Sequence, residues 1–318
     1  MNKVDATTAK RAARATVLTG LFFVSFVLFL VMTFPYEVLK ESIAANLSRA
    51  TGFNISIGDM SASLPLGMRA EKVRIDGSTA ATTVELKSLT INLSLLRLFL
   101  GQLGVICELT SGNGVLTATA NVGFLDLASG VALPKRITLD AKNFPLDDLI
   151  TFALNNAASS PTANPLLAPI LSTVGLSALL NATVDFNLDS KNLPQSTGQA
   201  DLNLANAVLK LSHPSIGLKD QKFKKAQIKA KLEGGTLLFD KASGFLSDGL
   251  ELVPEGKIIL KPVVTSSQLD LKILFKLTND LKSSFGFLLS SGSGSASTEG
   301  EMTTQVRGTI DQPVTVNF

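Results

Sequence analysis

The stretch that decides the fold is residues 181–189, NATVDFNLD. Apolar and polar residues alternate through it, a period of two that is typical of a strand with one apolar face and one polar face. The same alternation returns in residues 199–204, 228–233 and 269–277. Turn signals separate such segments, among them Asp76-Gly77, Asn113-Gly114, Gly234-Gly235 and Asp248-Gly249. The sequence therefore predicts a mainly β protein built on an antiparallel sheet.

The apolar face of such a sheet needs a cover, and the sequence offers few helices for it. The candidates are residues 146–158, which open with Asp147 and Asp148, and residues 165–180, which prolines interrupt. Either the sheet folds over on itself as a sandwich or barrel, or it curls into an open trough, groove- or half-barrel-like, whose interior meets a ligand. Periodicity does not choose between these. The prolines around residue 160 also allow two lobes.

Residues 16–34 form a run of nineteen without a charge, TVLTGLFFVSFVLFLVMTF. As a helix it spans roughly 28 Å, about the thickness of a hydrocarbon core. A transmembrane signal anchor explains it better than a cleaved signal peptide or a buried helix. Its residues include Thr16, Phe22, Phe26, Phe29 and Phe34.

Basic residues before the span fix the expected orientation. Lys3, Lys10, Arg11 and Arg14 precede it against one acidic residue, Asp5. The positive-inside rule then places the N-terminus in the cytoplasm and the rest of the chain across the membrane. Because the chain has 29 basic and 26 acidic residues, 25 of each remain after residue 35. The body has no basic excess for nucleic acid.

Four segments are expected. Residues 1–15 form a basic cytoplasmic arm, 16–35 the anchor, and 36–52 an amphipathic helix whose apolar face plugs the following domain or lies on the bilayer. Residues 53–318 form a β-rich domain with a helical insertion near 144–180.

Catalytic chemistry finds little support. The single His213 precedes Pro214 in an expected loop, and the single Cys107 lies in the apolar run Val105-Ile106-Cys107. Neither forms a metal cluster or a catalytic arrangement by spacing, and no phosphate-binding or hydrolase motif occurs. We expect no enzyme activity, no metal and no cofactor.

Four segments carry a family resemblance: residues 51–75, the run INLSLLRLFLGQLGVICELTSGNGVLTATA at 91–120, GKIILKP at 256–262 with SQLDL at 267–271, and RGTIDQP at 307–313. In order and spacing they resemble the protein N family of the bacterial type II secretion system. More broadly the chain is similar to AsmA-like and TamB-like periplasmic proteins. The resemblance implies a single-pass inner-membrane protein with a curved periplasmic β-groove and no catalytic residues.

Two functions follow as expectations. The first is a type II secretion component that binds partner proteins in the periplasm by a sheet edge or an apolar groove. The alternative is phospholipid binding and transport between the inner and outer membranes, with acyl chains held in the groove. The groove-lining candidates are Val184, Phe186, Leu202, Leu204, Ile273 and Phe275.

Overall fold

The computed structural model describes residues 22, 25, 29, 33, 36–64, 66–77, 83–123, 134–159, 174–189, 192–210, 220–278, 301–310 and 312–317. Within them lies one antiparallel sheet of sixteen strands, which confirms the predicted mainly β class. The strands are β1 Asn54–Ser63, β2 Gly67–Asp76, β3 Thr83–Leu93, β4 Gln102–Ser111, β5 Gly114–Gly123, β6 Arg136–Pro145, β7 Gly175–Asn187, β8 Thr197–Lys210, β9 Gln221–Lys222, β10 Lys225–Glu233, β11 Thr236–Phe239, β12 Gly244–Leu246, β13 Leu250–Ile259, β14 Gln268–Leu277, β15 Glu301–Thr309 and β16 Pro313–Asn317.

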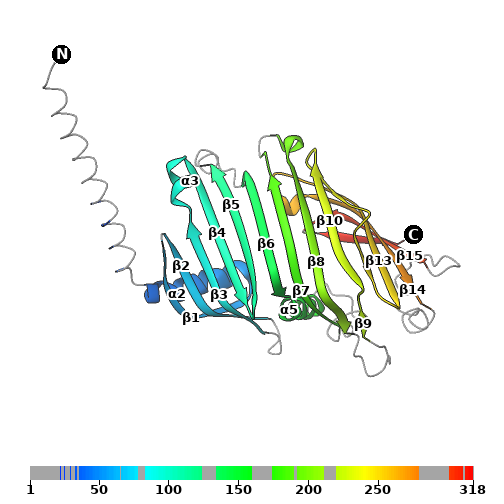
Figure 1. Cartoon of the computed structure of the whole chain (residues 1–318), viewed down its shortest axis with the longest axis horizontal. Helices are drawn as coiled ribbons and strands as arrows, with labels where there is room; N and C mark the ends of the chain where they lie inside the picture. Colours follow the sequence, from blue (N-terminus) through cyan, green and yellow to red (C-terminus); the bar gives the residue numbers. More distant parts are fainter. Residues whose placement is uncertain are drawn as a thin grey trace, which may run out of the picture.

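The order of the strands in space follows their order in the chain (Figure 1). Each pairs with the next as an antiparallel neighbour, apart from the short strands β9 and β12, which pair beside the main path. The path begins at β1 and ends at β16, and these two strands are not paired with each other in the described chain. The sheet therefore continues through β6, β7 and β8 without a break, so the described strands on either side of residue 160 belong to one sheet.

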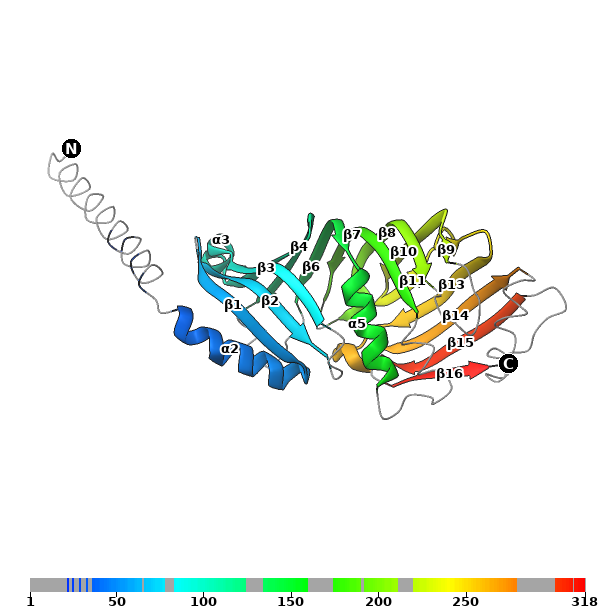
Figure 2. The same ribbon diagram turned by 90° about the horizontal axis from the view of Figure 1, so that it is seen from below.

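Two helices lie against the sheet. The helix α2, Tyr36–Thr51, lies beside β1, and α5, Asp147–Ala158, contacts both β3 and β7. Figure 2 shows the sheet arching over α5, with β1 and β16 at its two ends. Three single-turn helices complete the described elements: α3 Leu95–Phe99, η1 Leu193–Gln195 and η2 Val264–Ser266.

The strands bend at one level of the sheet. Three non-glycine residues have positive φ there: Lys72 (53°), Asn143 (47°) and Asn206 (53°). The pairing of β6 with β7 shifts next to Asn143, and that of β7 with β8 shifts next to Asn206. Such bulges kink a strand and change which residues face inward. In β1 and β2 the inward set also changes phase around Gly58 and Lys72, although the pairing of these strands keeps its register.

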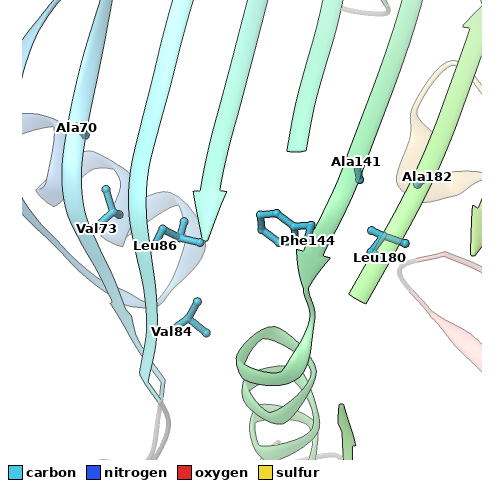
Figure 3. Packing of buried hydrophobic residues seen from close by; sticks show 8 residues of the cluster. All are labelled: Ala70, Val73, Val84, Leu86, Ala141, Phe144, Leu180 and Ala182. Atoms are coloured by element: carbon cyan, nitrogen blue, oxygen red, sulfur yellow. The ribbon is translucent and has the colours of Figure 1, made fainter. Parts of the chain in front are cut away.

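The main core lies where α5 meets the sheet. Side chains from β2, β3, β6 and β7 are buried there together (Figure 3), and Phe144 is 1% exposed. Leu149 and Phe152 of α5, together with Leu146 just before the helix, close this cluster. The ring of Phe152 also meets that of Phe53 edge to face, with centroids 4.9 Å apart.

The helical insertion expected near 144–180 is narrower than predicted. Helix α5 begins at Asp147 as the acidic pair suggested. Phe144 and Pro145, however, end β6, and Gly175 begins β7. The expected helix over 165–180 is wrong over its last residues, because Leu176, Leu179 and Leu180 pair with β8 and β6 instead.

Candidate apolar binding face

One row of cross-strand neighbours runs across most of the sheet on a single face. Directly opposed residues in antiparallel strands place their side chains on the same side, so the register alone traces the row. Every residue from β3 to β14 in this row is apolar or glycine: Leu93, Val105, Ala120, Ile137, Phe186, Gly198, Leu232, Leu237, Ile258 and Leu269. We call the side of the sheet that carries this row the apolar face.

All six residues predicted to line a groove lie on the apolar face. Val184 alternates with Phe186 on β7, and Ile273 and Phe275 follow Leu269 on β14 at steps of two. On β8, Leu202 opposes Ala182 and Leu204 opposes Leu180. The register brings β7 and β8 together but leaves β14 several strands away, across β10, β11 and β13.

The six residues divide by what they touch. Leu202 and Leu204 pack against the main core cluster, which is the behaviour of ordinary sheet core. The other four are half-buried and belong to neither of the two buried clusters found in the described residues. Four large apolar side chains on β7 and β14 therefore keep part of their surface accessible.

Phe186 also explains a glycine in the row. A Cβ at position 198 would lie 2.5 Å from Cδ1 of Phe186, closer than real Cβ contacts. The same Cβ would lie 2.3 Å from the backbone oxygen of Asp185, so both the β7 backbone and the ring leave room for glycine alone at this position. The Phe186 ring therefore lies next to Gly198 on the apolar face.

The opposite side of the sheet is polar and carries ion pairs between strands. Arg136 on β6 donates two hydrogen bonds to Asp185 on β7, of 3.0 and 2.7 Å. This bond with the guanidinium lowers the pKa of the Asp185 carboxyl. On β8, the hydrogen bond from Gln227, of 3.0 Å, and the nearby Lys229 lower the pKa of Asp201. The two faces are therefore chemically distinct.

A pocket of about 490 Å³ lies on β1–β3. Its lining includes Lys72, Arg74, Glu85 and Lys87. The Arg74 guanidinium is 2.8 Å from Asp76, and the Lys72 ammonium is 3.6 Å from Asp59. These acidic neighbours balance the basic lining, so the pocket has no charge excess that selects an anion.

Among the described residues no group of acidic, histidine or cysteine side chains is placed to hold a metal ion. Burial raises the pKa of the Cys107 thiol, so the thiolate is disfavoured. Asp147 accepts hydrogen bonds from Ser177 Oγ and from the amide of Ala178, at 2.5 and 3.0 Å, and so fastens α5 to β7. His213 lies outside the described residues.

The predicted anchor falls mostly outside the described residues. Thr16, Phe26 and Phe34 are not among them, whereas Phe22 and Phe29 are helical and largely exposed. In the described part of the chain, no helix combines the length and apolarity that crossing a membrane requires.

The two edge strands of the sheet, β1 and β16, differ in whether a helix packs against them. Helix α2 contacts the backbone of β1 at three points: Ile55 N–H donates to Ser48 Oγ (2.9 Å), Met60 N–H donates to Glu37 Oε1 (3.2 Å), and Lys40 Nζ donates to the Gly58 carbonyl (2.9 Å). Across the described residues, β16 pairs with β15 on one side and with no strand on the other. One edge is thus blocked by a helix.

Of the residues in the row, sequence reasoning named only Phe186 as groove-lining, and Leu237 and Ile258 are among those it missed. The segments TLLF at 236–239 and GKII at 256–259 show no alternation, so periodicity did not select them. The Gly234-Gly235 turn was the available signal, because a tight hairpin there places Leu232 opposite Leu237.

Comparisons of the chain with protein-family models, with curated proteins and with solved structures find no significant match.

Proposed function

We propose that this chain is a non-enzymatic, membrane-anchored protein that binds the acyl chains of phospholipids along its apolar face. The observation that supports this most is the unbroken row of apolar residues and glycine from β3 to β14, in which Phe186 is half-buried, together with the half-buried Ile273 and Phe275 on the same face. A soluble antiparallel sheet normally covers its apolar face with another layer. Among the described residues, α5 packs on only one part of that face.

The energetics favour an apolar occupant. Removing apolar surface from water stabilises by about 25 cal/mol per Å², or roughly 0.8 kcal/mol for each buried CH₂ group. An acyl chain that lies on the half-buried members of the row gains this at each methylene and requires no polar partner, whereas Leu232 is 1% exposed and already covered. The polar opposite face, with pairs such as Arg136–Asp185, stays in water.

The curved, groove-like form of the sheet and the anchor at residues 16–34 belong to the same proposal. The anchor would hold the chain in a bacterial inner membrane with the sheet in the periplasm, where it would receive lipid for transport toward the outer membrane. The uncharged run and the basic residues before it support this placement.

Two aspartate substitutions on opposite faces of β14 test the proposal. Ile273 and Lys272 are neighbours on β14 that point to opposite faces. In the full chain in mild detergent, Ile273→Asp should reduce the amount of fluorescently labelled phosphatidylglycerol that migrates with the protein on a native gel several-fold. Lys272→Asp should leave it unchanged. Equal binding by both variants, with matching circular dichroism spectra, would refute the proposal.

A second candidate is a component of the type II secretion system that adds a partner strand to the sheet. The edge of β16 that pairs with no strand among the described residues favours it, because unpaired backbone groups on an edge accept another strand. A photo-crosslinking residue at Val314, which is 56% exposed on β16, should then capture another secretion component in cells. Deleting the protein should also block export of folded periplasmic proteins. Normal export with a weakened outer-membrane barrier would favour the lipid function instead.

A further inference from the structure

Three exposed leucines project from one end of the sheet. Leu64 lies in the turn between β1 and β2, and Leu96 and Leu100 lie in and just after α3, between β3 and β4. Their exposed fractions are 65%, 72% and 68%, among the highest of the large apolar side chains outside α2. Isolated exposed leucines are common on proteins, but three that come together on neighbouring turns form a patch.

The register places these turns side by side. Ser63 opposes Gly67 across the β1–β2 turn, and Gly67 opposes Asn92 near the end of β3. The amide of Leu93 donates to the carbonyl of Leu66 over 2.8 Å, so the β1–β2 turn adjoins the segment that leads into α3. We call the end formed by Leu64, Leu96 and Leu100 the leucine tip.

A single charge accompanies the leucine tip. From Leu93 to Leu103 the sequence LSLLRLFLGQL contains one charged residue, Arg97. A Cβ at Gly104 would lie 2.5 Å from Arg97 Cδ, so the aliphatic stem of Arg97 rests against β4 at this glycine. Leucines around one arginine with a fixed stem suit the boundary between acyl chains and anionic headgroups.

The point where the chain enters α2 lies toward the same end. Glu37, in the first turn of α2, contacts the amide of Met60, whereas Ser48, near its end, contacts that of Ile55. Helix α2 therefore runs antiparallel to β1, and its first residue, Tyr36, lies toward the end of β1 that carries Leu64. Figure 2 shows the start of α2 and α3 at the same side of the molecule. The uncharged residues 16–34 directly precede this point.

We propose that the leucine tip inserts into the surface of the lipid bilayer that holds residues 16–34. This rests on the membrane anchor of the proposed function and adds a second attachment. With the anchor at Tyr36 and the leucine tip both at the bilayer, the end of the sheet near β1–β4 faces lipid, and the apolar face begins at the membrane.

The chain contains no tryptophan, so one substitution gives a unique fluorophore. The full chain with Leu96→Trp would be placed in vesicles of phosphatidylethanolamine and phosphatidylglycerol, with and without lipids brominated on their acyl chains. The matched control is Val263→Trp, because Val263 is 62% exposed in the loop between β13 and β14, far across the sheet. Both variants must keep the circular dichroism spectrum of the parent. Leu100→Trp replaces Leu96→Trp if the latter does not fold.

Brominated lipid should quench the tryptophan at the leucine tip about threefold more than the one at 263, with emission shifted to the blue. Equal quenching at both positions, or none at the tip in a protein that floats with vesicles, would contradict insertion of the leucine tip. It would not contradict the membrane anchor at residues 16–34. A protein that fails to float with vesicles after an alkaline wash would overturn both.

Discussion

Phe144 and Phe275 have the same side chain in two different settings. Phe144 is 1% exposed in the cluster beneath α5, and Phe275 is half-buried on β14, opposite Leu252. A buried aromatic ring contributes to stability through packing on every side, whereas a half-buried one leaves surface for a ligand. The same residue type therefore serves the core at one position and the proposed binding face at the other.

Truncation should separate the two roles. Phe144→Ala should lower the free energy of unfolding by about 3–5 kcal/mol, because the core around it closes only partly over the cavity. Phe275→Ala should cost about 1–2 kcal/mol and reduce lipid binding more than Phe144→Ala does. Urea denaturation and the native-gel lipid assay measure the two effects. Equal loss of stability at both positions would place Phe275 in the core.

The pair Arg136–Asp185 makes a pH-dependent contribution. Its hydrogen bonds lower the pKa of Asp185 in the folded state, so the stabilisation is complete above the unfolded value of about 3.9. It is lost as the pH falls through the lower folded value. Arg136→Met should therefore lower the urea midpoint slightly at neutral pH, because an exposed ion pair is screened by solvent. The gap between the urea midpoints of the two proteins should close as the solution becomes strongly acidic, and a constant gap would contradict this.

At the scale of elements, α2 serves as the cover of an edge strand. The side chains Glu37, Lys40 and Ser48 each meet a backbone group of β1, which takes those groups away from any incoming strand. The Lys40 ammonium also bonds Glu37 at 2.7 Å and lowers the pKa of its carboxyl, so that the acceptor stays charged. The first helix of the body is thus tied to the sheet by polar contacts.

Removing one of these acceptors should loosen the edge. Ser48→Ala leaves the Ile55 amide without its partner and should cost about 1 kcal/mol. Hydrogen exchange at Ile55 should become faster, while exchange at Ile75 in the adjacent β2 should change less. Ser61→Ala, at an exposed position on β1, is the matched control and should leave both unchanged. Unchanged exchange in Ser48→Ala would show that the hydroxyl does not hold this edge.

Sequence reasoning predicted elements well where one face was polar throughout. Residues 181–189 and 269–277 alternate strictly or nearly so, and 181–187 and 269–277 are strands with the expected faces. It failed over residues 175–180, because GLSALL is apolar on both sides and has no period to read. The change of inward face at Lys72 was not predicted either, since positive φ at a lysine leaves no composition signal.

At the scale of the whole molecule, the apolar row matters more than any residue in it. The alternation predicted which side of each strand is apolar, and the register joined those sides into one face. The alternation could not predict whether the sheet closes into a barrel, because closure depends on twist and bulges rather than on composition. The six candidate residues accordingly share a face, but Leu202 and Leu204 are packed in the core.

The most direct test of the central claim compares the two faces of one strand in living cells. A photo-crosslinking phenylalanine derivative would replace Phe275 on the apolar face or, as control, Lys272 on the polar face. The account predicts that the probe at 275 captures phospholipid and the probe at 272 does not. Capture of only the chain's own residues at 275, or of another protein in place of lipid, would contradict it.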